Sequence, residues 1–254
     1  LFTGNEVGAM LLEYICSERT KMGTMPADPV AVKTIVTTDI AAKIAKEYGV
    51  KLIEVLTGFK FIGEQIGFLE DKGQEDRYIF GFEESYGYLA GSYVRDKDAV
   101  VASMLICEMA AFYRTKGISL IQARENMYKK YGVYVHSQSS FVCEGVTGME
   151  RMKEIMSDLR TNTPKTIGGL TVTRFEDYLA STSVDTATGA KTMLTLPKSD
   201  VLTFKLTDGA SVIIRPSGTE PKIKAYYTTT GTTKAEAAAL EKTIFDDFAK
   251  ILGF

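Results

Sequence analysis

The first half of the chain alternates between two hydrophobic spacings, which predicts strands separated by helices. Apolar residues recur at helical spacing over residues 7–18, whereas residues 32–37, 51–55 and 78–82 are short runs rich in β-branched or aromatic side chains. Asp39 can cap a helix that ends at Gly49. Residues 1–118 therefore predict a three-layer α/β domain with a mixed, mainly parallel sheet.

A long helix is expected to close this half, starting at Asp96 or Asp98. Its buried side is predicted from the apolar spacing to carry Val101, Met104, Leu105, Met109 and Phe112. Ser119 and Gln122 then form a capping-box pattern for a helix over residues 119–132, which we expect to connect two domains.

After residue 132 the pattern becomes that of a sheet with few helices. Residues 133–142 and 170–175 are strand-like, and residues 202–206 alternate before Asp208-Gly209, which predicts a hairpin into the strand at residues 212–214. Residues 181–191 are rich in Thr, Ser and Ala and predict a polar loop. Residues 133–254 thus predict a smaller α+β domain with an antiparallel sheet and helices on one face.

Two capped helices complete this second domain. Thr147 with Glu150 predicts the start of one, and Thr233 with Glu236 predicts the start of the last. The inward-facing residues of the last helix are expected to be Leu240, Ile244, Phe248 and Ile251.

Composition narrows the class of protein without naming a function. The 254 residues suffice for one large domain or two ordinary ones, and 45% hydrophobic and 24% charged residues are typical of globular proteins. A formal net charge of -2 gives no reason to expect nucleic acid or a membrane as a partner. A phosphate ligand needs only local positive charge, so this balance does not count against one.

The cysteines and the apolar runs indicate the cytoplasm. Cys16, Cys107 and Cys143 are far apart and form no C-x-x-C pair, which fits a reducing compartment. The longest apolar stretch, residues 99–113, contains Glu108 and is too short to span a bilayer, and no signal peptide is recognised. The chain enters a helical pattern directly after Leu1, so we expect it to be a piece of a longer protein.

Residues 212–224 (VIIRPSGTEPKIK) contain the clearest candidate for binding chemistry. An apolar strand ends at a loop that two prolines stiffen, and a second alternating strand follows. Arg215 offers a planar fork, Ser217 and Thr219 offer hydroxyls, and Gly218 lets backbone N–H groups approach a ligand. This is the chemistry of a phosphate or carboxylate cradle, and the alternative is an ordinary hairpin with a polar turn.

Two further loops follow the carboxyl ends of predicted parallel strands, where ligands gather in such sheets. They are residues 57–63 and residues 81–87 (GFEESYG). Glu83 and Ser85 are two residues apart, so in an extended loop both would point toward the same vicinal hydroxyls. The alternative is a solvated acidic turn. His136, the only histidine, lies in a predicted strand and is expected to be a packed or surface residue.

The two motifs together resemble the α-D-phosphohexomutases, the phosphoglucomutase and phosphomannomutase family. R-P-S-G-T-E-P at residues 215–221 resembles the phosphate-binding loop of that family, and residues 81–87 resemble its sugar-binding loop. The resemblance covers nearly the whole chain, but only the third and fourth of the family's four domains. The forms E-E-S-Y-G at residues 83–87 and V-R-D-K-D at residues 94–98 resemble the phosphoglucomutase branch most.

The resemblance implies a role for each matching residue. Arg215, Ser217, Gly218 and Thr219 would hold the non-reacting phosphate, and Glu83 and Ser85 would contact the sugar. Thr57, Gly58 and Lys60 would also face the substrate, although T-G-F-K could simply begin a helix. Lys97, in the segment YVRDKD, would approach the phosphosugar, although the same segment can be a charged first turn of a helix.

The resemblance implies a reaction for which this chain has only part of the equipment. The family's phosphorylated serine, in a T-A-S-H-N-P-like loop, and its magnesium loop, of D-x-D-x-D-R type, belong to the first two domains and are not found here. We therefore expect a C-terminal fragment, inactive alone and without its own metal, of an enzyme that interconverts hexose 1-phosphate and hexose 6-phosphate. A phosphomannomutase, a phosphopentomutase or a non-catalytic sugar-phosphate-binding module are the alternatives.

Overall fold

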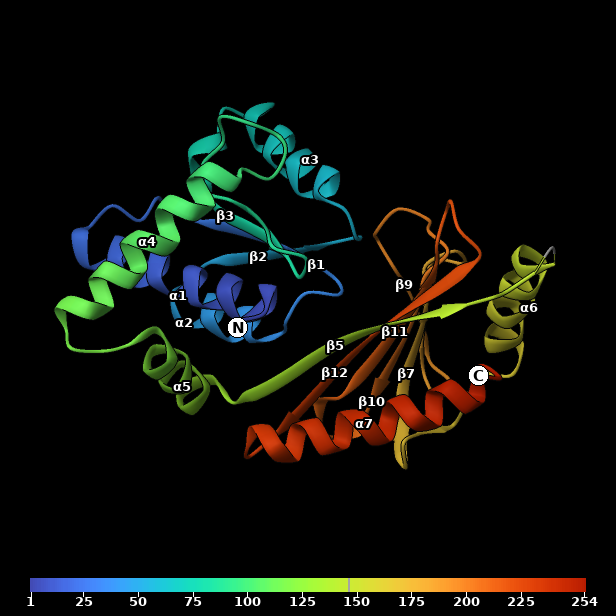
Figure 1. Cartoon of the computed structure of the whole chain (residues 1–254). Coiled ribbons are helices and arrows are strands. Elements are labelled where there is room, and N and C mark those ends of the chain that lie inside the picture. Colours follow the sequence, from blue (N-terminus) through green and yellow to red (C-terminus); the bar gives the residue numbers. More distant parts are fainter. Residues whose placement is uncertain (146) are drawn as a thin grey trace. The chain divides into compact units, whose positions relative to one another are not determined.

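A computed structural model describes residues 1–145 and 147–254. These residues form two compact units, Leu1–Gly132 and Val133–Phe254, and each is described by itself (Figure 1). The helix α5 (Leu120–Tyr131) belongs to the first unit, where it packs against α1 (Gly4–Met22) and α4 (Ala99–Thr115).

Unit 1 is built on a four-stranded sheet in its described part, with the order β2-β1-β3-β4. The strands are β1 (Val30–Thr34), β2 (Lys51–Val55), β3 (Tyr78–Glu83) and β4 (Gly87–Leu89). β1 pairs in parallel with β2 and β3, and β3 turns back into the antiparallel β4. The remaining elements are α2 (Ile40–Glu47), α3 (Phe59–Glu70) and the short 3-10 helix η1 (Glu75–Arg77).

Helices cover both faces of this sheet. Val30 and Val32 pack under α3, in one cluster with Ile62 and Ile66. On the opposite face Phe82 lies against Gly8 of α1, where an added Cβ would be 2.1 Å from the ring. The structure therefore confirms the predicted α/β fold with its mixed, mainly parallel sheet.

Several predictions for the helices of unit 1 are wrong in detail. Asp39 precedes α2 but makes no capping bond, because its carboxylate accepts from the ammonium of Lys33 instead. α3 begins at Phe59, so the loop predicted over residues 57–63 is shorter. Met104 of α4 is exposed rather than buried, whereas Met109 is buried as expected. Asp98 caps α4 by accepting from two backbone N–H groups.

Unit 2 has an antiparallel sheet with the order β5-β12-β11-β10-β7-β8-β9, and β6 pairs with β7 at one side. In chain order the strands are β5 (Val133–Val142), β6 (Thr166–Ile167), β7 (Leu170–Asp177), β8 (Thr182–Asp185), β9 (Lys191–Met193), β10 (Leu202–Leu206), β11 (Ser211–Pro216) and β12 (Lys222–Gly231). The helices are α6 (Gly148–Thr161) and α7 (Lys234–Ile251), with a 3-10 turn, η2 (Thr207–Gly209), between β10 and β11.

Both helices of unit 2 bury their apolar sides against one face of the sheet. Met156 of α6 and Phe248 of α7 share a cluster with Phe204, Val212 and Tyr227, which alternate with residues that point to the other face. The predicted α+β fold with helices on one face is confirmed. The predicted hairpin at Asp208-Gly209 is also confirmed, since β10 and β11 pair in antiparallel.

Three expectations for unit 2 are wrong. Residues 181–191 are not simply a polar loop, because they contain β8 and the start of β9, which pair with each other; their exposed polar side chains gave no apolar alternation. Thr147 makes no side-chain capping bond to α6. Ile251 is 36% exposed at the end of α7, while the next residue, Leu252, is buried instead.

Helix α3 offers a matched test of this packing. An added Cβ at Gly63 would lie 2.1 Å from the backbone oxygen of Arg95, whereas one at Gly67 would meet nothing within 4 Å. Gly63→Ala should therefore destabilise the chain by about 1–3 kcal/mol because the segment before α4 must move. Gly67→Ala should instead stabilise it by about 0.5–1 kcal/mol, since glycine is costly inside a helix.

Urea unfolding followed by circular dichroism measures both changes. Equal unfolding free energies for the two variants would contradict the described contact between α3 and Arg95.

Candidate functional site

The carboxyl ends of β1, β2 and β3 lie at one edge of the unit 1 sheet, and a buried lysine joins two of them. Lys33 of β1 is fully buried, and its Nζ lies 2.7 Å from Glu54 Oε1 of β2 and 3.0 Å from Asp39 Oδ1. It also donates to the carbonyl oxygen of Thr37 at 3.0 Å. Burial lowers the pKa of Lys33, but the two carboxylates outweigh burial and its pKa is raised overall. Lys33 is therefore an ammonium ion that fixes the start of the β1–α2 loop.

The first turn of α1 is attached to two loops at this edge. Asn5 Oδ1 accepts from the backbone N–H of Thr38 at 2.9 Å. Gly4 lies so close to the turn after β3 that an added Cβ would be 2.0 Å from the oxygen of Glu84. A capping box between Thr3 and Glu6 starts this helix. The helix end therefore sets the positions of both loops.

The candidate sugar loop is the turn of the β3–β4 hairpin, in which Glu83 pairs with Gly87. Residues 84–86 form this turn, and Tyr86 has a φ of 65°, so the premise of an extended loop is wrong and alternation does not align Glu83 with Ser85. Gly87 leaves room for the Glu83 side chain, since an added Cβ would be 2.6 Å from its Oε1. Within the described residues neither Glu83 nor Ser85 makes a side-chain hydrogen bond to the protein. Both groups are available to a ligand.

The structure brings Lys97 to the loop that begins α3. The Nζ of Lys97 lies 5.8 Å from the ring centroid of Phe59, and also 3.1 Å from Asp96 Oδ1. Thr57 and Gly58 precede this ring, and Gly58 has a φ of 119°, which favours glycine. Lys60 is exposed, with its ammonium 4.9 Å from the ring of Phe61. Two exposed ammonium groups therefore flank the first turn of α3.

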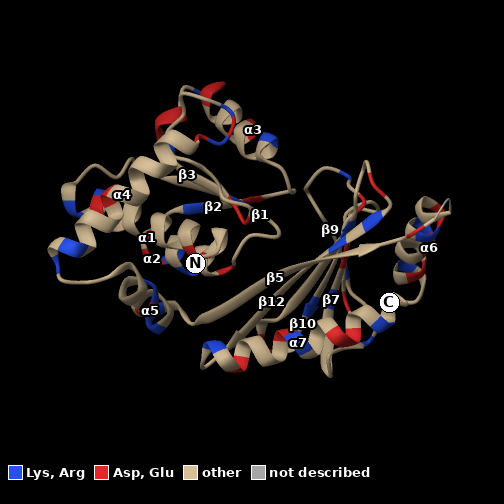
Figure 2. Cartoon of the chain, viewed as in Figure 1, with Lys and Arg blue, Asp and Glu red and all other residues tan. Residues whose placement is uncertain are grey.

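In unit 2 the candidate phosphate loop joins β11 to β12, two strands that carry basic residues at the ends that the loop connects (Figure 2). Ser217 N–H donates to the Lys222 oxygen at 2.8 Å, and Ser217 Oγ accepts from the N–H of Glu220 at 3.3 Å. The space around Gly218 is open and its φ is not left-handed, so the fold itself does not demand glycine there. Gly218 and Thr219 are exposed at the tip.

Arg215 and Lys224 are directly opposite each other on β11 and β12, and so lie on the same face of the sheet. Like charges in that position are destabilising unless an anion lies between them. The Arg215 guanidinium donates to a neutral group, since its Nε and Nη2 lie 3.3 and 3.2 Å from the Tyr226 hydroxyl oxygen. Lys222 forms an ion pair with Glu220 and holds the pKa of that carboxyl below its usual range, and the charge of Lys224 makes a smaller contribution. Arg215 and Lys224 thus place two cationic groups side by side on the sheet face away from the helices.

For some of these residues, the part they play in the site could not be recognised from the sequence. Lys33 alternates with β-branched residues as a solvent-facing lysine would, and Asn5 carries no signal. Tyr226 and Lys224 have the same strand parity, which was the available clue that both share a face with Arg215. His136 lies in β5 as predicted, stacked on Tyr134 and hydrogen-bonded to Thr228 at 3.1 Å.

Metal ligands do not gather in the described part of the chain. Residues 1–145 and 147–254 contain no cluster of His, Cys, Asp and Glu that could hold a metal ion, so the residues present do not fit the magnesium that the resemblance implies for the whole enzyme. In the same residues, none of the helices has the length and apolar character needed to cross a bilayer.

Comparison with known proteins points to one family for both units. Residues 3–131 match the family model described as phosphoglucomutase/phosphomannomutase, alpha/beta/alpha domain III. Residues 159–247 match the model described as phosphoglucomutase/phosphomannomutase, C-terminal domain. A phosphoglucomutase of Staphylococcus aureus strain bovine RF122 / ET3-1 is 37% identical over 225 residues, which are 89% of this chain and 39% of that protein. The chain therefore spans about two fifths of the length of such curated relatives.

Solved structures support the same fold. The open form of pp63/parafusin, a phosphoglucomutase from Paramecium, superposes with a TM-score of 0.69 at 19% identity. The superposition covers 100% of this chain and 42% of the parafusin chain. A putative phosphomannomutase from Thermus thermophilus gives a TM-score of 0.59 at 16% identity. That superposition covers 100% of this chain and 41% of the Thermus chain.

The buried ammonium of Lys33 yields a pH-dependent prediction. Because its folded pKa is raised, its contribution to stability is fully present below the unfolded pKa of about 10.4 and is lost as pH rises through the folded pKa. Glu54→Gln removes a partner and should lower the unfolding free energy by about 1–3 kcal/mol at neutral pH. The difference from the parent chain should shrink as pH rises beyond about 10.4, because deprotonation of Lys33 removes the charge that Glu54 stabilises.

Glu70→Gln is the matched control, since Glu70 pairs with Arg95 at an exposed position and should contribute about 0–1 kcal/mol. Urea unfolding at pH 7 and at pH 11 measures all three chains. A Glu54→Gln effect no larger than that of Glu70→Gln, or one that does not change with pH, would count against the described ion cluster.

Proposed function

The chain belongs to the phosphoglucomutase/phosphomannomutase family, and from this premise we propose that it supplies the sugar and phosphate contacts of a hexose-phosphate mutase. The reaction is the interconversion of hexose 1-phosphate and hexose 6-phosphate. The observation that carries the proposal is the placement of the candidate loops. Residues 57–60, 83–85 and 97 fall inside the match to domain III, and residues 215–219 fall inside the match to the C-terminal domain.

Unit 1 binds the sugar in this proposal. The carboxylate of Glu83 accepts hydrogen bonds from two neighbouring hydroxyl groups of the sugar, and the hydroxyl of Ser85 either donates or accepts one. Thr57 and Gly58 shape the loop that begins α3, while Lys60 and Lys97 bring positive charge toward the phosphorylated end of the sugar. A half-buried carboxylate with no protein partner is suited to a neutral polyol, because its hydrogen bonds are left for the ligand.

Unit 2 binds the phosphate that does not react. The Arg215 guanidinium donates in parallel to two phosphate oxygens, and the anion relieves the repulsion between Arg215 and Lys224. Ser217 and Thr219 add hydroxyl donors, and the backbone at Gly218 approaches the phosphate closely. Binding of this kind fixes one end of the sugar phosphate without taking part in bond breaking.

In this proposal the chain positions the substrate, and the groups that transfer phosphate lie in other domains of the complete enzyme. We propose that a phosphoserine of the complete enzyme gives its phosphate to one end of the sugar and recovers phosphate from the other end. Magnesium would neutralise charge on the transferred group there, and no step is assigned to it in this chain. Phosphoryl transfer depends mainly on positioning and charge stabilisation, and these loops supply the first of the two.

Glucose is the preferred hexose in this proposal, since the curated relatives at 36–37% identity are named phosphoglucomutases. We also propose that the chain alone does not catalyse the reaction. Mutase activity of the purified 254-residue chain, measured with glucose 1-phosphate, would overturn that part of the proposal.

The phosphate contacts can be tested by titration of the chain with inorganic phosphate. Arg215→Ala should weaken binding by roughly 10-fold to 100-fold, because charge-assisted hydrogen bonds contribute about 1.5–3 kcal/mol. Arg174→Ala is the control, as Arg174 is an exposed arginine on β7 in the same sheet, outside the loop. Isothermal titration calorimetry gives the dissociation constants of both variants. Equal values would contradict the assignment of Arg215 to the phosphate site.

The sugar contact can be tested in a complete mutase that contains this chain. Glu83→Gln should reduce kcat/KM for glucose 1-phosphate by about 10-fold to 100-fold, because a neutral amide accepts hydrogen bonds from hydroxyl groups more weakly than a carboxylate does. The neighbouring Glu84→Gln serves as the control. If Glu84→Gln were as damaging as Glu83→Gln, or if Glu83→Gln were fully active, the assignment of Glu83 would be wrong.

A further inference from the structure

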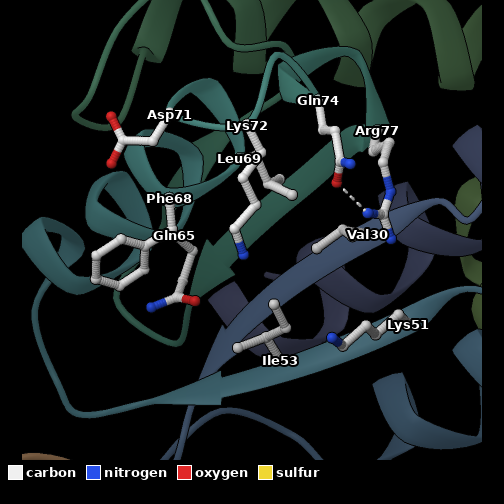
Figure 3. A pocket seen from close by; sticks show the side chains of 10 residues that line it. All are labelled: Val30, Lys51, Ile53, Gln65, Phe68, Leu69, Asp71, Lys72, Gln74 and Arg77. Atoms are coloured by element: carbon white, nitrogen blue, oxygen red, sulfur yellow. Dashed lines mark hydrogen bonds between the residues drawn. The ribbon is translucent and has the colours of Figure 1, made fainter.

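A pocket of about 300 Å³ lies in unit 1, away from the edge that carries the candidate sugar loop. Its walls are the later turns of α3, the segment that follows α3, and the first residues of β1 and β2 (Figure 3). Val30 and Lys51 are the first residues of their parallel strands, so the pocket is at the amino ends of the strands. Glu83 stands at the carboxyl end of β3, so the two places are on opposite edges of one sheet.

The floor of this pocket is apolar and its rim is positively charged. Val30, Ile53 and Leu69 line the floor, and the ring of Phe68 is 50% exposed beside them. The ammonium groups of Lys51 and Lys72 both point into the same space (Figure 3). Within the described residues neither lysine has an ion-pair partner.

Arg77 and two amides complete the rim. Arg77 is held in place, because its Nη1 donates to Gln74 Oε1 at 2.6 Å and its Nε donates to the oxygen of Asp28 at 2.8 Å. The bond from Arg77 uses only the amide oxygen of Gln74, so the amide nitrogen of Gln74 can donate to a ligand. The amide of Gln65 faces the same space (Figure 3). The rim therefore offers cations and amide N–H groups to an acceptor.

Two sources of negative charge lie near these cations, the carboxylate of Asp71 and the carboxyl end of α3, and neither balances them. The carboxylate of Asp71 lines the pocket but points away from both lysine ammonium groups (Figure 3). The carboxyl end of α3 carries roughly half a negative charge, which one lysine is enough to offset. Lys72 can serve that purpose, but Lys51 and Arg77 remain in excess, and ammonium groups that converge without an anion repel each other.

We propose that this pocket binds a small organic phosphate that carries a planar ring, of the mononucleotide class. The phosphate lies between Lys51 and Lys72 and accepts from Arg77, while the ring stacks on the exposed face of Phe68. Gln65 and Gln74 donate to polar atoms of the ring or sugar. This site is separate from the proposed sugar-phosphate contacts and does not depend on them.

Calorimetric titration of the 254-residue chain with adenosine monophosphate tests the proposal. The titration is done on an Arg215→Ala background, so that the candidate phosphate loop cannot account for binding. The double variant Lys51→Gln/Lys72→Gln should weaken binding by at least tenfold. Lys46→Gln, an exposed lysine of α2 outside the pocket, should leave it unchanged.

The proposed stacking on Phe68 is tested by a separate variant. Phe68→Ser should weaken binding of adenosine monophosphate by about tenfold and leave binding of ribose 5-phosphate unchanged, because only the former can stack. In the parent chain, addition of adenosine monophosphate should shift the methyl NMR signals of Val30 and Ile53, a readout that needs no variant.

Absence of binding at millimolar ligand, binding that survives loss of both lysines, or equal affinity for inorganic phosphate and the mononucleotide would each overturn the proposal. None of these results would affect the assignment of Arg215, which is tested by inorganic phosphate and the Arg215→Ala and Arg174→Ala pair.

Discussion

The arrangement of unit 1 depends on an ammonium group that has no contact with water. Lys33 joins β1 to Glu54 of β2 and to Asp39 in the loop that leads to α2. A buried ion pair adds little net stability, because desolvation offsets most of the attraction, but removing one partner is costly. The cluster therefore acts mainly as a geometric constraint. It permits one placement of the strand ends, and the loops that follow β1, β2 and β3 inherit that placement together with their attachment to the first turn of α1.

A second theme is positive charge that converges at two places. Arg215 and Lys224 share one face of the unit 2 sheet, and Lys51 and Lys72 point into one pocket of unit 1. In each case we propose that a bound phosphate reduces the repulsion between the cations. The contrast with Lys222 is informative, because Glu220 neutralises it from within the same loop.

Much of the fold was predictable because it rests on local pattern. The strands at residues 51–55 and 133–142 were predicted with their observed bounds, and Asp98, Ser119 and Thr233 cap the helices as expected. The errors arise where a distant partner decides. Asp39 binds Lys33 rather than its own helix, and β8 and β9 pair through backbone groups with little apolar signal.

The candidate site shows the same division. The rule that ligands gather at the carboxyl ends of parallel strands pointed to the two loops of unit 1. The chemistry of the Arg215 loop fitted either an anion cradle or an ordinary polar turn, and the family resemblance favoured the cradle. The hairpin that turns Ser85 away from a simple alternation with Glu83, and the burial of Lys33, follow from tertiary contacts that spacing does not encode.

The most direct measurement is a crystal structure of a complete mutase containing this chain, soaked with glucose 6-phosphate. The account predicts the phosphate within hydrogen-bonding distance of the Arg215 guanidinium and the Ser217 hydroxyl, and sugar hydroxyls on the carboxylate of Glu83. A bound sugar phosphate that touches neither Arg215 nor Glu83 would contradict it.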